Sequence, residues 1–317
     1  MSRVSSSVSS PGALWTYILA FIAGIACTTI FHSLGAQHTA QPRLGKGAVI
    51  AAHSPASPIV QAPVLASRST GASPAIVAAA AALIVDAEKK AEKLVKYGGT
   101  VYGGWSTVPT MIPDQPIIYD YGLGMDISWP LHMIKTKHAQ VWGFDVTTES
   151  VKYLTAEEAA GRIPAEFHWV KQLLGKSNEP VRLTIPEKDG FASFGAADKV
   201  ANNRGKYVEF PAQTLTSAMA ANGHDVIDIL KLDVEGAEFD VIKHWQQSEF
   251  AAEAMLPACQ LLVEHHQRFY PEDGAQRMAD MKSALRFLGF VPIVQEQEQL
   301  WVNVKHPLCV KQLEQVQ

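Results

Sequence analysis

Short apolar runs alternate with polar, helix-compatible stretches from residue 98 to the C-terminus. This alternation predicts an α/β fold with a mostly parallel sheet. The expected strands are residues 116–121, 140–145, 167–174, 181–185, 226–233, 259–265, 290–295 and 300–305. The expected helices are residues 128–137, 156–161, 214–221, 239–248 and 274–288. The last two strands follow each other closely, so we expect them to form an antiparallel hairpin.

A different pattern, nearly unbroken hydrophobicity, marks residues 14–34. No Asp, Glu, Lys or Arg occurs between Val4 and Pro42, and a bilayer core needs about 20 apolar residues. We therefore expect a single-pass transmembrane signal-anchor in the lipid bilayer. The alternative is a cleaved secretory signal ending near the small residues Ser33 and Gly35.

The remaining organisation follows from local composition. Residues 1–13 form an N-terminal tail, residues 35–75 an Ala/Ser/Pro-rich linker and residues 76–97 an expected helix. Residues 98–317 form the expected globular domain. We expect an endomembrane location, in the Golgi or the ER, with this domain in the lumen, although the basic residues flanking the span do not set its orientation.

Charge and cysteine content exclude several classes of protein. Of the 317 residues, 27 are Lys or Arg and 31 are Asp or Glu. Residues 1–85 contain no acid and carry +4, so the rest of the chain carries −8. An acidic body is a poor partner for a phosphate backbone, and we expect no nucleic-acid binding. Cys27, Cys259 and Cys309 show no paired framework, which predicts neither a disulfide scaffold nor a cysteine zinc site.

The first strand end with candidate chemistry is IIYDYGLGMDIS, residues 117–128. Asp120 lies at the end of the strand, and Gly122 and Gly124 form a turn at which a ligand can approach the backbone closely. A dinucleotide-binding fingerprint would need a small residue where Ile127 stands. The turn therefore favours a ligand without a diphosphate.

Asp145 ends the next strand, 23 positions after Gly122. An acid at about this distance from a glycine turn accepts hydrogen bonds from ribose hydroxyls. The alternative is a role at the start of the following helix, which Thr147, Thr148 and Ser150 can also serve. The glycine turn upstream favours ribose binding.

The third strand end is DILKLDVEGAEFDVI, residues 228–242, with three carboxylates close to Gly236. Asp233, Glu235 and Glu238 repel one another at this spacing. Glu238 is explained by the favourable dipole at a helix N-terminus. We expect Asp233 and Glu235 to hold a cationic or polyhydroxylated ligand.

These segments resemble one known family. FDVTTES, LKLDVEGAEFDVI and IYDYGLGMDIS are similar to the FkbM-type branch of S-adenosylmethionine-dependent methyltransferases, especially its membrane-anchored, methyltransferase-like members. The resemblance covers about residues 100–305 and implies a Rossmann-like class I methyltransferase fold, with a seven-stranded sheet, and O-methyl transfer. It implies that Asp120, Gly122 and Gly124 line the methionine and adenosyl moieties, that Asp145 binds the ribose and that Asp233 lies beside the substrate.

The proton of the acceptor hydroxyl needs a base, and LLVEHHQRFYPED, residues 261–273, offers candidates. His265 or His266 is suited to this role because imidazole titrates near neutral pH. Neighbouring residues of a strand point to opposite faces, so at most one of them faces the site. Glu264, like Glu235, is a candidate for binding the substrate. An alternative is a divalent metal held by Asp233, Glu264 and one histidine.

Together these features predict a membrane-anchored S-adenosylmethionine-dependent methyltransferase that methylates a hydroxyl of a small-molecule or carbohydrate-like acceptor. Two alternatives remain. One is a membrane-tethered binding module of the same fold without turnover, and the other is a nicotinamide-dependent oxidoreductase.

Overall fold

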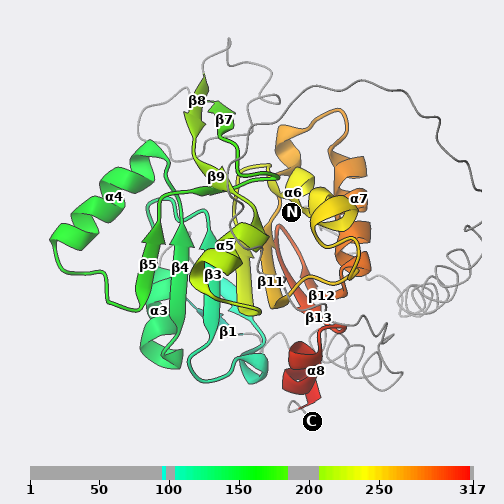
Figure 1. The fold of residues 1–317 in the computed structure, drawn as a ribbon, viewed down its shortest axis with the longest axis horizontal. Helices are drawn as coiled ribbons and strands as arrows, with labels where there is room; N and C mark the ends of the chain where they lie inside the picture. The colour runs from blue at the N-terminus through cyan, green and yellow to red at the C-terminus, as the bar shows by residue number, and fades with distance from the viewer. Residues whose placement is uncertain (1–94, 98–103, 185–206, 315–317) are drawn as a thin grey trace, which may run out of the picture. The chain divides into compact units, whose positions relative to one another are not determined.

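A seven-stranded sheet forms the centre of the described part of the chain (Figure 1). The computed structural model describes residues 95–97, 104–184 and 207–314. The strand order is β12-β13-β11-β10-β3-β4-β5. The strands are β3 (Ile117–Tyr121), β4 (Gln140–Phe144), β5 (Phe167–Val170), β10 (Ile227–Leu232), β11 (Ala258–Glu264), β12 (Phe290–Gln295) and β13 (Glu298–Asn303).

Five of these strands run parallel, and the last two close the sheet as an antiparallel hairpin. Strand β13 pairs antiparallel with both β11 and β12, while β5, β4, β3, β10 and β11 pair in parallel. From β3 the chain adds β4 and β5 on one side and then returns to add β10 on the other. The strand order therefore reverses between β3 and β10, and ligands of open α/β sheets bind at such a point, beyond the carboxyl ends of the strands.

Helices are placed between the strands along the chain, as expected for this class of sheet. They are α3 (Ser128–Lys137), α4 (Thr148–Ala159), α5 (Leu215–Asn222), α6 (Glu238–His244), α7 (Gly274–Phe287) and α8 (Pro307–Glu314). Single turns lie at η1 (Pro109–Met111), η2 (Trp245–Glu249, a π-helical turn) and η3 (Gln267–Phe269). One hydrophobic core joins alternate residues of β3, β10 and β11 to the apolar sides of α5, α6 and α7.

Three short two-stranded sheets accompany the central one. Strand β1 (Val95–Tyr97) pairs with β2 (Trp105–Thr107), β6 (Leu173–Leu174) with β9 (Ala212–Gln213), and β7 (Val181–Thr184) with β8 (Tyr207–Phe210). Strand β2 contacts β11 and β13, so it lies against the central sheet.

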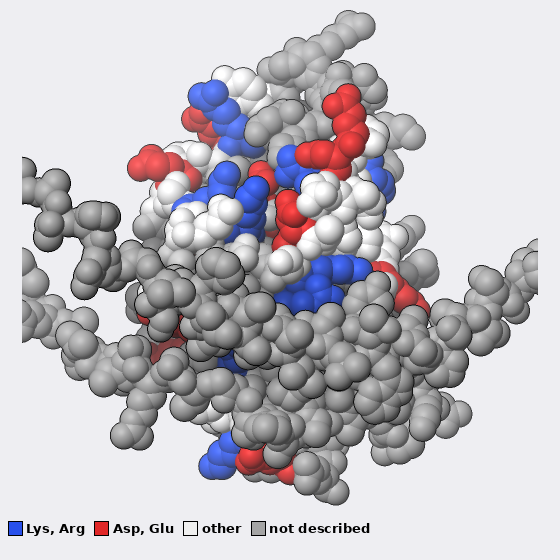
Figure 2. Space-filling model, turned by 90° about the vertical axis from the view of Figure 1, so that its right-hand side faces the viewer, with Lys and Arg blue, Asp and Glu red and all other residues white. Residues whose placement is uncertain are grey.

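The charges on the surface are mixed in sign where the structure describes them. Figure 2 shows acidic and basic side chains lying side by side over the described part of one face. Ion pairs also occur on the described surface, such as Lys152 with Glu149 at 2.8 Å and Arg182 with Glu209 at 2.8 Å.

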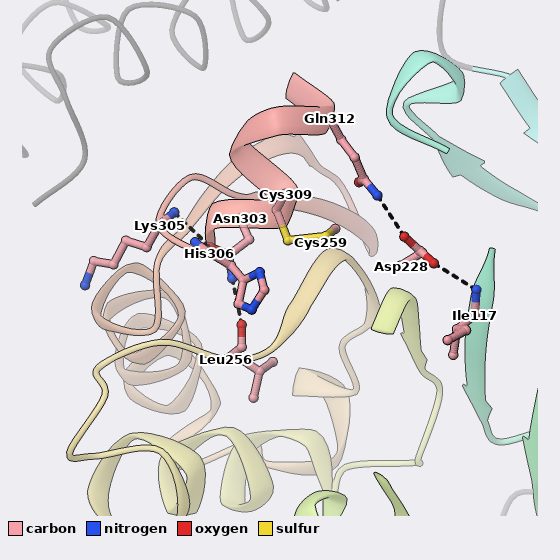
Figure 3. The surroundings of a disulfide bond; sticks show 9 residues. All are labelled: Ile117, Asp228, Leu256, Cys259, Asn303, Lys305, His306, Cys309 and Gln312. Atoms are coloured by element: carbon pink, nitrogen blue, oxygen red, sulfur yellow. Dashed lines mark hydrogen bonds between the residues drawn. A yellow bond between two sulfur atoms is a disulfide. The ribbon is translucent and has the colours of Figure 1, made fainter. Parts of the chain in front are cut away.

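A disulfide between Cys259 and Cys309 links helix α8 to the start of strand β11 (Figure 3). The expectation of no cysteine pair was wrong, because the two residues are 50 positions apart and only the fold brings their Cα atoms to 4.9 Å. The amide of Gln312 also donates to Asp228 at 2.8 Å, and Asp228 accepts the N–H of Ile117 at 2.8 Å. Helix α8, which was not predicted, is thus held at the amino-terminal edge of the sheet.

Most expected elements are present, with three corrections. The strand expected over residues 167–174 divides, because Gln172 N–H bonds back to Val170 at 2.9 Å and β6 leaves the central sheet. The strand expected over residues 181–185 pairs with β8 outside that sheet. The helix expected over residues 156–161 is α4, which begins eight residues earlier, in a segment whose Thr and Val residues have low helix propensity.

The expectations for the N-terminal third fall mainly on residues outside the described part. This holds for the tail, the transmembrane segment 14–34, the linker 35–75 and most of the helix 76–97; residues 95–97 are strand β1 instead of helix. Among the residues that the structure describes, no helix is long and apolar enough to cross a membrane.

Candidate functional site

The loops that follow β3 and β10 touch at the carboxyl edge of the sheet. Gly122 has a φ of +88°, and a Cβ at this position would lie 1.8 Å from the backbone oxygen of Asp233. The N–H of Asp233 donates to the carbonyl of Tyr121 at 3.0 Å. Any side chain at position 122 would push the two loops apart, so the contact requires glycine.

Gly124 has a different environment. Its φ is +55°, and a Cβ built there would meet no atom within 4 Å. Residues 122–124, here called the glycine turn, therefore leave backbone accessible beside the end of β3. This is the part of the switch point where a ligand can approach the main chain.

Lys231 is a buried cation beneath the glycine turn. Its Nζ donates to Asp120 at 2.7 Å and to the carbonyl of Gly122 at 2.9 Å, and it lies 5.1 Å from the centre of the Trp105 ring. The side chain of Lys231 is only 6% exposed and that of Asp120 only 2%. Burial alone lowers the pKa of Lys231, but the charges of Asp120 and Asp233 outweigh it and raise the pKa. Lys231 therefore stays charged and fixes one side of the turn.

Asp145 fixes the other side of the glycine turn. Its Oδ2 accepts the N–H groups of Leu123 and Gly124, both at 3.1 Å, and the Ser150 hydroxyl at 2.8 Å. Its Oδ1 accepts the N–H and the hydroxyl of Thr147 at 2.9 and 2.7 Å. A carboxylate offers about four lone-pair sites, so this one is fully used within the chain.

The acid–histidine cluster, defined as Asp233, Glu235, Glu264 and His266, lies where β10 and β11 end. His266 Nε2 is 3.3 Å from a carboxylate oxygen of Glu235 and 3.7 Å from one each of Asp233 and Glu264. The imidazole is 1% exposed, whereas the three acids are 20–30% exposed. Glu235 reaches the cluster from a left-handed backbone position with a φ of +51°, which is uncommon for a residue with a side chain.

Glu238 lies behind the histidine and is completely buried. Its Oε2 accepts the N–H of Gly236 at 2.8 Å, and its Oε1 accepts the N–H of His266 at 2.7 Å. The same Oε1 is 3.4 Å from His266 Nδ1. Glu238 thus holds the histidine from the side opposite the other three acids.

Burial and mutual repulsion shift the titration of this cluster. Burial raises the pKa of Asp233 to about 7, with Lys231 opposing the shift and Glu264 adding to it. Burial lowers the pKa of His266, but the adjacent carboxylates, Glu238 first, outweigh it and raise the pKa. An aspartate that titrates near neutral pH beside a buried histidine is suited to general base catalysis.

The structure separates the two histidines that the sequence could not distinguish. His265 donates its N–H to the carbonyl of Gln297 at 3.2 Å and is not one of the groups around Asp233. Burial lowers its pKa. His266 is the histidine that the fold brings to Asp233.

The other expected site residues are found at the same edge of the sheet, with different surroundings. Asp120, Gly122, Gly124 and Asp145 surround the glycine turn, but the carboxylates of Asp120 and Asp145 contact the protein itself. Their assignment as cofactor ligands stays a prediction. Lys231 was missed, although a lysine inside the apolar run DILKL is a signal, since lysines are almost never buried without a partner.

A hollow of about 150 Å³ lies beside β2, β12 and β13. It is lined by Trp105, Ser106, Val294, Glu296, Glu298, Gln299 and Leu300. Glu298 pairs with Glu264 across β13 and β11, and Gln297 donates to Glu264 at 2.7 Å. The lining of the hollow therefore includes several oxygen-bearing side chains and the nearly buried Trp105.

The central sheet has seven mostly parallel strands and a C-terminal hairpin, and acidic residues lie at the edge where the strand order reverses. These features define a Rossmann-like α/β fold of the class I methyltransferase type. Within this class, residues 168–292 match the model of the methyltransferase FkbM domain, which confirms the resemblance seen in the sequence. The matched segment contains the whole acid–histidine cluster. The chain is thus similar to methyltransferase FkbM domains over residues 168–292.

Comparisons with other proteins add little beyond this. No curated protein matches the chain. Among solved structures, the fibrillarin pre-rRNA processing protein of Methanococcus jannaschii is 11% identical over 62% of this chain and 69% of that chain, with a TM-score of 0.35. The N-terminal domain of human METTL16 in complex with SAH is 12% identical over 59% of each chain, with a TM-score of 0.31. A human methyltransferase 10 domain containing protein is 11% identical over 69% of this chain and 79% of that chain, with a TM-score of 0.33. Scores this low carry no argument about substrate.

Proposed function

We propose that this protein is a membrane-tethered, S-adenosylmethionine-dependent O-methyltransferase whose acceptor is a small or carbohydrate-like molecule. The observation that carries the proposal is the position of the acid–histidine cluster, at the carboxyl edge of β10 and β11 and in contact with the glycine turn through Asp233. A proton acceptor and an accessible backbone turn lie side by side there. These are the two parts that methyl transfer to a hydroxyl requires.

The described residues fit the proposed cofactor. S-adenosylmethionine supplies a methyl group carried on a sulfonium cation. The open space at Gly124 leaves room beside the backbone of the glycine turn, and the carboxylates of Asp233 and Glu235 suit a positive charge. No diphosphate-binding loop is needed, in keeping with Ile127 at the third position of the fingerprint.

Within this proposal the chain's own residues orient the reactants and take up a proton. Lys231 and Asp145 hold the glycine turn in one conformation from its two sides. The Asp233 carboxylate, beside the imidazole of His266, accepts the proton of the acceptor hydroxyl as the oxygen becomes a nucleophile. Asp120 and Asp145 then act on the cofactor through the turn and not as direct ligands.

The hollow beside β2, β12 and β13 is the proposed acceptor site. Ser106, Glu296 and Glu298 offer hydrogen-bonding groups, and the nearly buried Trp105 lies among the lining residues. A sugar-like acceptor presents hydroxyls that match the hydrogen-bonding groups of this lining. The mixed surface charge in Figure 2 gives no reason to propose a nucleic acid as the acceptor.

The proposed location is an oxidising lumen, with residues 14–34 as the tether. The support comes from the Cys259–Cys309 disulfide, because disulfides persist in secretory compartments and are rare in the cytosol.

The test is a calorimetric titration of the full chain, purified in mild detergent, with S-adenosylmethionine. Binding at micromolar concentrations that is lost in Asp145→Ala is the expected result, and methyl transfer to a panel of sugars and small alcohols would follow. Exposed Asp225→Ala is the matched control. A folded chain that does not bind the cofactor contradicts the proposal.

One observation favours a second candidate, a tethered binding module without turnover. The Asp145 carboxylate has no lone pair left for a ribose hydroxyl in this conformation. Cofactor binding without transfer to any hydroxyl acceptor would support this candidate.

A further inference from the structure

We propose that Asp233, Glu235 and His266 form a binding site for a divalent transition-metal cation of the Mn²⁺ or Zn²⁺ type. One oxygen from each acid and one imidazole nitrogen lie within 4.8 Å of one another. The inference deepens and rests on the proposed function, because a cation here would hold the acceptor hydroxyl beside the cluster. Cation binding itself needs neither cofactor nor turnover.

The histidine is the observation that points to a ligand. His266 is 1% exposed, and its Nδ1 is a buried atom without a hydrogen bond among the described residues. Its Nε2 points at Glu235, Asp233 and Glu264 from 3.3 to 3.7 Å. A buried Oε2 of Glu235 also lacks a hydrogen bond. Buried polar atoms are rarely left in this state unless something else binds them.

The surroundings of His266 resemble the second shell of a metal site. A metal-bound histidine commonly directs its other ring nitrogen at a carboxylate, which fixes the ring and its tautomer. Here the Nδ1 of His266 faces Oε1 of Glu238 at 3.4 Å. Two backbone N–H groups hold Glu238 in place. With a proton on Nδ1, the lone pair of Nε2 is directed at the two acids.

The mixed donor set selects the kind of cation. Ca²⁺ and Mg²⁺ prefer oxygen ligands alone, whereas imidazole with carboxylates suits first-row transition metals. Metal–ligand distances of about 2.0–2.2 Å place ligand atoms at most about 4.4 Å apart. The partly exposed side chains of Asp233 and Glu235 can make the small inward movement that this requires.

The competing explanation is a protonated His266 that only balances the charges of the acids around it. In that case the cluster is complete within the protein and has no place for a cation. The two explanations predict opposite results in a metal titration, because a protonated imidazole cannot act as a ligand.

The experiment titrates Mn²⁺ into the EDTA-treated full chain in mild detergent at pH 7.5, with free Mn²⁺ followed by electron paramagnetic resonance. We expect one saturable site per chain, about tenfold or more weaker in Glu235→Gln and in Asp233→Asn. Zn²⁺ should displace Mn²⁺, and Ca²⁺ should not. Glu272→Gln removes the same charge from an exposed position outside the cluster and should leave affinity unchanged.

Glu235→Gln is the decisive variant because its partly exposed side chain can be replaced without unfolding the chain, which far-ultraviolet circular dichroism verifies. Absence of saturable Mn²⁺ binding in the wild type, or equal affinity in Glu235→Gln, would overturn the inference. S-adenosylmethionine titrated into the same samples separates the two proposals. Metal binding without cofactor binding refutes only the proposed function, and cofactor binding without metal binding refutes only this inference.

Discussion

Replacing Lys231 by methionine tests whether the buried ion pair holds the glycine turn. Lys231→Met keeps most of the side-chain volume but removes the charge that contacts Asp120 at 2.7 Å and Gly122 at 2.9 Å. Asp120 is 1% exposed and would be left without a counter-charge. Breaking a buried pair from one side costs about 3–5 kcal/mol, a large share of the roughly 5–15 kcal/mol that stabilises a typical domain.

The double variant Lys231→Met/Asp120→Asn provides the control within the same site. It removes the unpaired charge, so we expect it to recover about 1.5–3 kcal/mol of the loss, within the usual range for residues in direct contact. Its affinity for S-adenosylmethionine should stay low, because the carbonyl of Gly122 still lacks its donor. The exposed variant Lys243→Met should leave both stability and affinity unchanged.

The assay is urea-induced unfolding followed by tryptophan fluorescence, with calorimetric titration of the cofactor on the same samples. If the double variant recovers stability but not affinity for S-adenosylmethionine, the ion pair with Asp120 stabilises the fold. The hydrogen bond from Lys231 to Gly122 then holds the turn in the conformation that binds the cofactor. If Lys231→Met costs less than about 1 kcal/mol, or if the double variant is no more stable than the single one, Lys231 and Asp120 are not coupled as the geometry indicates.

Four further outcomes are expected. Gly122→Ala should abolish cofactor binding and destabilise the fold, because its Cβ would overlap the backbone oxygen of Asp233; a variant with wild-type stability and affinity refutes the close contact. Asp145→Asn should weaken cofactor binding, since an amide cannot accept all five hydrogen bonds; unchanged calorimetric affinity would contradict this. The paired variant Cys259→Ala/Cys309→Ala should lose about 2–5 kcal/mol in urea unfolding relative to the oxidised wild type, and no loss would show that α8 is held by its other contacts. Asp233→Asn tests the pH dependence: burial raises the pKa of Asp233 from 3.8 to about 7, so its contribution to stability is complete below pH 4 and is lost as the pH rises to 7. The stability of Asp233→Asn relative to the wild type should therefore increase from pH 4 to pH 7 and stay constant above pH 7. A constant difference in stability between pH 4 and pH 7 would refute the raised pKa of Asp233.

Local patterns along the chain predicted the elements more reliably than their partners. The helix expected over residues 128–137 and the strand expected over residues 290–295 match α3 and β12 residue for residue. Residues 181–185 were recognised as extended, but their pairing with β8 was not, because the pattern of one strand contains no information about its neighbour.

The candidate site shows the same division. The sequence alone indicated that Asp120, Asp145 and Asp233 lie at the ends of buried strands, and that three acids crowd around Gly236. It could not choose between His265 and His266, because the choice depends on how the chain turns after β11. It also could not show that the glycine turn after β3, together with Thr147 and Ser150, uses every lone pair of the Asp145 carboxylate.

What the sequence by itself determined is therefore the class of fold, the resemblance to FkbM methyltransferases and the strand ends that carry the chemistry. These depend on hydrophobic periodicity and on turn residues, which act over a few positions. Only the tertiary structure decided the Lys231–Asp120 pair, the Cys259–Cys309 bond and the grouping of His266 with Asp233 and Glu235. Each of these contacts joins segments that are distant in sequence, and they meet because β3, β10 and β11 are neighbours in the sheet or because α8 folds back onto β11.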